Sequence, residues 1–228
     1  DADLDEAVEG TLHSAFGFAG QKCSACSRAI VLAEHYDEFV ERLSEATRSL
    51  TFGPTDDPGP GLGPVVDEAS HRRLQKVISD AVERGIRLVV GGDPVEQPGY
   101  FIAPTIFADV PPDDVLATDE FFGPILAVIK ADDFEHALTI ANGTEYALTG
   151  GLFSRSPKRI AQARQDFRVG NLYINRSITG AIVGRQPFGG GAMSGGGTKA
   201  GGPDYLLQFL DPRTITENTL RRGFAPEA

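Results

Sequence analysis

The sequence predicts an α/β protein with a mainly parallel sheet flanked by helices. Two observations lead to this fold class: an amphipathic helix pattern is followed by a short apolar strand pattern, and this order recurs three times along the chain. Parallel strands need a crossover connection, which is usually a helix, so the helices are expected on both faces of the sheet. A chain of 228 residues with 41% hydrophobic residues can bury such a core.

The N-terminal third predicts helix, strand and helix in that order. Apolar residues first recur at three- or four-residue spacing, at Leu4, Val8, Leu12 and Ala15. Residues 27–32 read as a strand, and a helix with Asp37 as its N-cap is expected to follow, with its apolar face on Phe39, Val40, Leu43, Ala46, Thr47 and Leu50.

In the middle of the chain, a predicted helix is again followed by a predicted strand. Residues 53–64 are rich in Gly, Pro and Asp and predict a surface loop. The next helix starts near Asp67 and stops at Gly85. Three strands are expected directly after helices, at residues 86–90, 150–153 and 171–175, the latter two after helices at 134–141 and at Ser156-Pro157.

The two ends of the chain predict a neighbouring subunit and an upstream part of the protein. Residues 205–210 are apolar, and residues 213–220 alternate like a partly exposed strand, which we expect a neighbouring subunit to cover. The chain begins at Asp1, inside a pattern that already reads as a helix, so an upstream part of the protein is expected.

Composition excludes several classes of function. A net charge of −11 argues against nucleic acid and anionic membranes as partners. No apolar run approaches the roughly 20 residues of a membrane-spanning helix, and the acidic N-terminus is no secretory signal, so a cytoplasmic protein is expected. The two cysteines indicate a reducing setting, and we expect no metal site because the four histidines are not paired at ligand spacing.

The most informative segment is Gly20-Gln21-Lys22-Cys23-Ser24-Ala25-Cys26. From the residues alone it admits a Cys-x-x-Cys redox pair, half of a zinc site, or a small buried cysteine that only packs. Cys23 follows a Gly-Gln turn between a helix and a strand, which could present its thiol in a cleft. A nucleophilic thiolate needs local stabilisation, for which Lys22 and turn amides are candidates.

Residues 16–28 resemble the active-site signature of the aldehyde dehydrogenase superfamily, and the resemblance makes Cys23 the nucleophile. A second motif, residues 120–124, is similar to the family's Glu-x-Phe-Gly-Pro. It implies that Glu120 binds the nicotinamide ribose of NAD and that Phe122 packs beside the nicotinamide. A third, residues 187–195, resembles the aldehyde-pocket loop. Taken without Cys23, the second and third motifs have a purely structural interpretation. Glu120 is then a solvated acid, Phe122 a core residue and the glycine-rich stretch a flexible loop.

Within the superfamily, residues 175–188 and 199–205 look like those of 1-pyrroline-5-carboxylate (glutamate γ-semialdehyde) dehydrogenases. The resemblance implies that backbone amides of Gly180 and Ala181 and the hydroxyl of Ser24 bind the substrate α-carboxylate, while Phe188 lines the aliphatic stem. Glycine and alanine let the backbone approach an anion closely. Residues 191–193 depart from the family, where larger residues are common, which affects the outer pocket.

The resemblance also divides the chain. Residues 1–210 are expected to form the catalytic domain, and residues 211–228 an oligomerisation strand and tail, giving a homo-oligomer. The NAD-binding domain, the general-base Glu and the oxyanion Asn are expected upstream, so this chain alone should be nearly inactive. The implied activity is NAD-dependent oxidation of glutamate γ-semialdehyde to glutamate in proline catabolism. The alternatives are another semialdehyde dehydrogenase, a Cys-x-x-Cys thiol-disulfide protein, or a non-catalytic relative.

Overall fold

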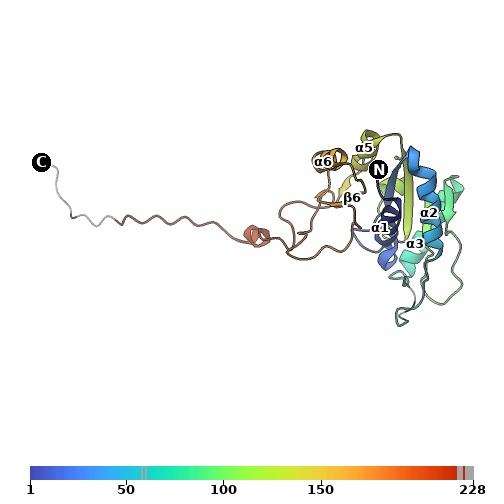
Figure 1. The fold of residues 1–228 in the computed structure, drawn as a ribbon. Coiled ribbons are helices and arrows are strands. Elements are labelled where there is room, and N and C mark those ends of the chain that lie inside the picture. Colours follow the sequence, from blue (N-terminus) through green and yellow to red (C-terminus); the bar gives the residue numbers. More distant parts are fainter. Residues whose placement is uncertain (58, 60, 220–222, 224–228) are drawn as a thin grey trace.

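The computed structural model describes residues 1–57, 59, 61–219 and 223 (Figure 1). Its main sheet has the strand order β1-β4-β3-β2, and two smaller sheets pair β6 with β7 and β5 with β8. The strands are β1 (Arg28–Leu32), β2 (Arg87–Val90), β3 (Thr105–Ala108), β4 (Ile125–Ala131), β5 (Tyr146–Ala147), β6 (Thr149–Leu152), β7 (Asn171–Ile174) and β8 (Gly191–Ala192). The helices are α1 (Leu4–Phe16), α2 (Tyr36–Arg48), α3 (Glu68–Glu83), α4 (Val115–Thr118), α5 (Phe134–Asn142) and α6 (Pro157–Asp166), with 3₁₀ turns η1 (Gly17–Gly20), η2 (Ala33–His35) and η3 (Tyr205–Phe209).

The main sheet is mainly parallel, as predicted. Strand β4 lies at its centre and pairs in parallel with β1, from Arg28 opposite Ala127, and with β3, from Thr105 opposite Ile125. Strand β2 runs antiparallel to β3, with a shift of register between Leu88 and Val90. The expected strands at 86–90, 150–153 and 171–175 are all present, although the first is the antiparallel edge.

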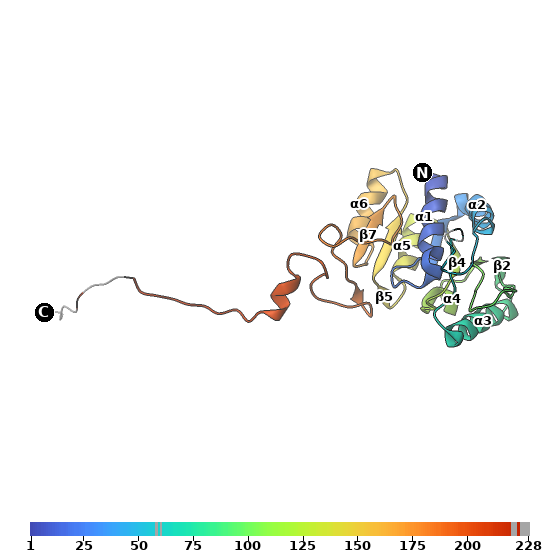
Figure 2. The same ribbon diagram turned by 90° about the horizontal axis from the view of Figure 1, so that it is seen from below.

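Helices cover both faces of this sheet, which confirms the α/β class (Figure 2). Strand β4 is buried on both sides and alternates between two apolar clusters. Ile125, Ala127 and Ile129 face the cluster formed with α3 and α5. Leu126 and Val128 face the cluster formed with α1 and α2. The central strand is apolar on both faces because each face is packed against helices.

Most helix starts follow the sequence. The carboxylates of Asp3, Asp67 and Asp133 accept backbone N–H groups of the first turns of α1, α3 and α5, and Ser156 does so for α6. The prediction that Asp37 caps the next helix is wrong. The turn η2 leads directly into α2, which begins at Tyr36, so Asp37 lies inside the first turn.

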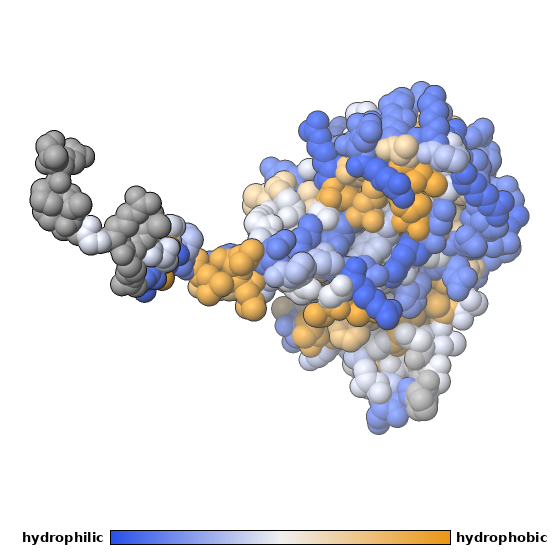
Figure 3. Space-filling view, turned by 60° about the vertical axis from the view of Figure 1, so that its left-hand side comes forward, coloured by the Kyte–Doolittle hydropathy of each residue, from blue (hydrophilic) through white to orange (hydrophobic). Residues whose placement is uncertain are grey.

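The C-terminal segment leaves the body of the protein (Figure 1). In Figure 3 its apolar side chains form an exposed projection, which comprises Leu206, Leu207, Phe209 and Leu210. Residues 213–219 form no strand in the single chain, and residue 220 with most of the tail lies outside the described residues. The pairing of this segment with a neighbouring subunit stays a prediction. None of the described helices combines the length with the apolar character that a membrane span requires.

Candidate active site

The segment that carries Cys23 starts with a left-handed bend. Phe18, Ala19 and Gly20 follow α1 with φ values of 61°, 54° and +67°. Such backbone is strained for residues with a side chain, so tertiary contacts must stabilise it. A turn follows, in which the Ala25 N–H donates to the Lys22 carbonyl at 2.9 Å. Cys23 lies in this turn and is exposed.

The two cysteines differ in their surroundings. Cys26 is partly buried, and its thiol donates to the Arg28 carbonyl with a sulfur–oxygen distance of 3.3 Å. Burial raises the pKa of the Cys26 thiol to about 11, which disfavours the thiolate. The geometry therefore favours Cys23 over Cys26 as an attacking thiol. The Lys22 ammonium, a candidate for stabilising a thiolate, lies 6.0 Å from the centroid of the Phe18 ring.

The second motif packs against this bend through two glycines. A Cβ on Gly20 would lie 2.2 Å from the Gly123 carbonyl oxygen, so only glycine permits the contact. Gly123 in turn packs against Leu74 of α3, where its own Cβ would meet a methyl carbon at 2.4 Å. Residues 20 and 123 are thereby in backbone contact, which brings Cys23 and Glu120 to the same region.

Phe122 adopts a strained conformation within the second motif. Its φ is 53°, and its side chain is 44% exposed. The preceding carbonyl, that of Phe121, accepts a hydrogen bond of 2.7 Å from the Arg73 guanidinium. An exposed aromatic ring on strained backbone is more typical of a functional position than of packing. The alternative in which Phe122 is a core residue is wrong.

Gln21 fixes the cysteine segment to a third part of the chain. Its side-chain carbonyl accepts the Val66 N–H at 2.8 Å, and its amide donates to the carbonyls of Phe18 and Pro64 at 3.4 Å each. These bonds attach the segment before α3 to the bend before Cys23.

The segment predicted to bind the substrate carboxylate runs from Asn175 to Phe188 and is named the third loop. Asn175 (φ 51°) exchanges hydrogen bonds of 2.8 and 2.9 Å with the backbone of Ser154. Gly180 has a φ of +80° and is exposed, as is Ala181. Phe188 exchanges backbone hydrogen bonds of 2.8 and 2.9 Å with Ala200, which fixes the far end of the loop.

A cavity of about 600 Å³ opens beside Cys23. Cys23, Glu120 and Phe122 all line it, so three of the predicted site residues come together. Ser24 is buried, and neither it nor Gly180, Ala181 or Phe188 is among the lining residues; the third loop reaches the wall through Arg176 and Ile178.

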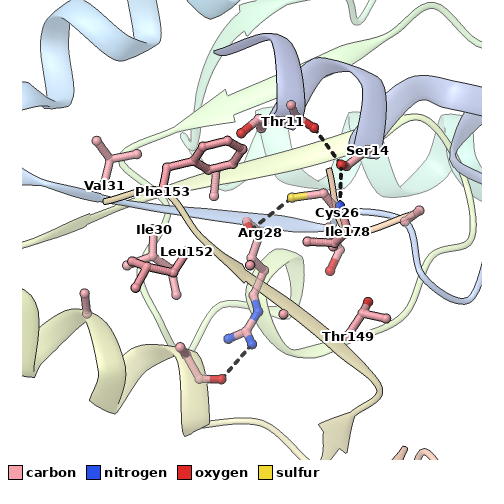
Figure 4. Close-up of a pocket in the computed structure, with 18 of the residues that line it drawn as sticks. Thr11, Ser14, Cys26, Arg28, Ile30, Val31, Thr149, Leu152, Phe153 and Ile178 are labelled. Atoms are coloured by element: carbon pink, nitrogen blue, oxygen red, sulfur yellow. Dashed lines mark hydrogen bonds between the residues drawn. The ribbon is translucent and has the colours of Figure 1, made fainter. Parts of the chain in front are cut away.

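The inner part of the cavity lies between the unpaired edges of β1 and β6, each of which ends its sheet among the described residues (Figure 4). Arg28 projects from β1, and its guanidinium donates to the carbonyls of Ile140 and Ala141 at 3.1 Å each. Burial lowers the pKa of Arg28. Arg28 is not among the residues predicted for the site, although a charged residue in an apolar strand is a signal that could have found it.

The cavity wall can be compared with what a metal or a nucleoside cofactor would require. Nowhere in the described ranges do three or more His, Cys, Asp or Glu side chains form a group that could hold a metal. Glu120 offers a carboxylate and Phe122 a ring at the same cavity wall. This pair suits the hydroxyl groups and the flat ring of a nucleoside.

Comparison with known proteins gives consistent matches. A model of the aldehyde dehydrogenase family matches residues 1–215. The 1-pyrroline-5-carboxylate dehydrogenase of Bacillus subtilis is 51% identical over 217 residues, which are 95% of this chain and 42% of that protein. The chain therefore spans about two fifths of the length of the curated relatives that it matches.

Solved structures agree with these matches. Proline utilization A from Bdellovibrio bacteriovorus superimposes with a TM-score of 0.93 at 56% identity, covering 100% of this chain and 24% of that one. The 1-pyrroline-5-carboxylate dehydrogenase from Thermus, solved with bound NAD, gives a TM-score of 0.89 at 48% identity, covering 92% of this chain and 40% of that one.

Proposed function

The chain belongs to the aldehyde dehydrogenase family, and from this premise we propose that it carries the nucleophile of an NAD-dependent enzyme that oxidises glutamate γ-semialdehyde to glutamate. The observation that carries the proposal is the exposed Cys23 at a cavity shared with Glu120 and Phe122. The similarity to 1-pyrroline-5-carboxylate dehydrogenases supports the substrate.

In the proposed reaction the Cys23 sulfur attacks the aldehyde carbon and forms a carbon–sulfur bond. The backbone N–H of Cys23 holds part of the negative charge that develops on the aldehyde oxygen. NAD, when bound, accepts the hydride that leaves this carbon. Loss of the hydride leaves a thioester between Cys23 and the substrate. Water then hydrolyses this thioester, which releases the carboxylate and restores the Cys23 thiol. Cys26 takes no part, since burial raises the pKa of its thiol.

Glu120 and Phe122 are the residues of this chain proposed to hold the nicotinamide end of NAD. The Glu120 carboxylate can accept hydrogen bonds from two ribose hydroxyls. The Phe122 ring is exposed at the cavity and offers a flat apolar surface to the nicotinamide. Together they orient the cofactor toward the Cys23 side of the cavity.

The substrate α-carboxylate is proposed to bind to the backbone N–H groups of Gly180 and Ala181 and to the Ser24 hydroxyl, with Phe188 beside the aliphatic stem. Gly180 and Ala181 are exposed, which leaves room for an anion, and Gly180 has the positive φ that is common in anion-binding turns. Ser24 follows Cys23 directly, but it is buried and, like Gly180, Ala181 and Phe188, does not line the cavity, so this part of the proposal rests on the resemblance.

We further propose that residues 1–210 act as a catalytic domain, that residues 211–228 pair with a second copy, and that the chain alone is nearly inactive. The relatives have more than twice its length, and the general-base Glu and the oxyanion Asn that the resemblance implies are expected outside this chain. The exposed projection at Leu206–Leu210 supports association through the C-terminal segment.

The test is NAD reduction with glutamate γ-semialdehyde by the full-length protein and by the 228-residue chain. We expect turnover only in the former. Cys23→Ala should abolish it, while the matched control Cys26→Ala should leave most of it. Loss of activity in Cys26→Ala alone would instead support a thiol-disulfide protein. Equal KM values for aldehydes with and without an α-carboxylate would contradict the proposed substrate.

A further inference from the structure

Ser14 contacts both the cysteine segment and the third loop, although the proposed reaction assigns it no role. It lies in the last turns of α1 and is 2% exposed. Its backbone carbonyl accepts the Cys26 N–H at 3.0 Å. This bond satisfies a carbonyl that the end of a helix would otherwise leave without a partner, and it attaches α1 to the cysteine segment.

The Ser14 side chain makes the connection to the third loop. Its hydroxyl accepts the Ile178 N–H at 3.1 Å and donates to the Gly10 carbonyl at 2.6 Å. Figure 4 shows Ser14 between α1, Cys26 and Ile178. A hydroxyl has one proton, and the bond to Gly10 uses it, so toward Ile178 the oxygen can act only as an acceptor. A backbone N–H requires such an acceptor.

The segment beyond Ile178 contains the proposed carboxylate-binding amides. Thr179 is buried, whereas Gly180 and Ala181 are exposed. At Gly180 no atom lies within 4 Å of the position that a Cβ would take. The Ile178 N–H bond to Ser14 thus ties the chain to α1 two residues before Gly180.

We infer that Ser14 is a positioning residue that sets the distance between the Cys23 turn and the carboxylate-binding amides of Gly180 and Ala181. The inference rests on the proposed function. Ser14 thereby matches this distance to the length of the substrate, because the carboxylate and the aldehyde group must reach their binding partners at the same time.

The test compares Ser14→Ala with Thr11→Val in the full-length protein. Both changes remove a buried hydroxyl from the same face of α1, but the Thr11 hydroxyl makes no hydrogen bond to the third loop in the described structure. For Ser14→Ala we expect a KM for glutamate γ-semialdehyde about fivefold higher, the equivalent of one net hydrogen bond. The KM for propanal should change by a smaller factor than the KM for glutamate γ-semialdehyde. The same holds for the kcat values with both aldehydes. Ser14→Thr, which keeps the hydroxyl, should restore the KM.

Hydrogen exchange of the Ile178 amide separates this inference from the proposed function. Ser14→Ala should speed that exchange about fivefold, whereas Thr11→Val should not. Unchanged exchange, or an equal rise of KM for both aldehydes, would overturn the positioning role. Absence of turnover in the wild type would refute the proposed function, while the exchange rates would still decide whether Ser14 anchors the loop. If Ser14→Ala does not fold, Ser14→Thr must keep the wild-type exchange rate, or the inference fails.

Discussion

Replacing Gly20 by alanine should destabilise the protein through two separate effects. The first is backbone strain, since Gly20 has a φ of +67°. A residue with a Cβ pays about 1–2 kcal/mol in that conformation. The second is a clash, because the new Cβ would lie 2.2 Å from the Gly123 oxygen and 2.5 Å from its carbonyl carbon. Both atoms are backbone and cannot rotate away.

Overpacking of this kind typically costs about 1–3 kcal/mol. With the strain, Gly20→Ala should lower the free energy of unfolding by about 2–5 kcal/mol. Gly85 provides a matched control, since its φ is +81° and no atom lies within 4 Å of its Cβ position. Gly85→Ala should therefore cost only the strain, about 1–2 kcal/mol.

Urea unfolding of the full-length protein, followed by circular dichroism, measures both losses. The alkylation rate of Cys23 provides a local readout, because the bend that precedes Cys23 should open in Gly20→Ala. If Gly20→Ala costs no more than Gly85→Ala, the contact between the two motifs does not stabilise the protein, and the reasoning is refuted.

Three further outcomes are expected. Tyr36→Phe should lower the free energy of unfolding by about 1–3 kcal/mol in urea, since the buried Tyr36 hydroxyl bonds two backbone groups, whereas the control Tyr100→Phe, at an exposed site, should have little effect. Burial raises the pKa of Cys26 from 9.0 to about 11, so the unfolded chain releases its proton first, and stability should fall between pH 9 and 11 by up to about 1 kcal/mol per pH unit. Urea midpoints across this range should show less of that fall in Cys26→Ala; an identical slope would contradict the assigned cause. Iodoacetamide at pH 8 should alkylate the exposed Cys23 before Cys26, and mass spectrometry showing equal rates would argue against their different surroundings.

The fold class could be predicted from the sequence, but the central strands of the sheet could not. Neither β3 nor β4 was expected, although residues 125–131 are a nearly continuous apolar run. Such a run does not alternate, because β4 is packed on both faces, and periodicity alone cannot separate a buried strand from a buried helix. The strands at 86–90, 150–153 and 171–175 were found because a helix with a clear stop precedes each one.

The candidate site was predicted in part. The resemblance to the family's motifs selected Cys23, Glu120 and Phe122, which line one cavity. Ser14 gave no comparable signal and Arg28 only the weak one of a charge in an apolar strand, since the partners of both lie more than a hundred residues away in the chain. The amphipathic pattern marks Ser14 only as a helix residue. Which backbone groups its hydroxyl meets is decided by tertiary packing.

The contact between Gly20 and Gly123 also bears on the order of events during synthesis. A ribosome releases residue 123 long after residue 20, so a nascent chain contains Cys23 well before the backbone that supports its bend exists. Domains generally fold as units once enough of the chain has emerged. We therefore expect the thiol to acquire its final geometry only after the second motif has left the ribosome, which would delay its reactivity until its proposed partners are in place.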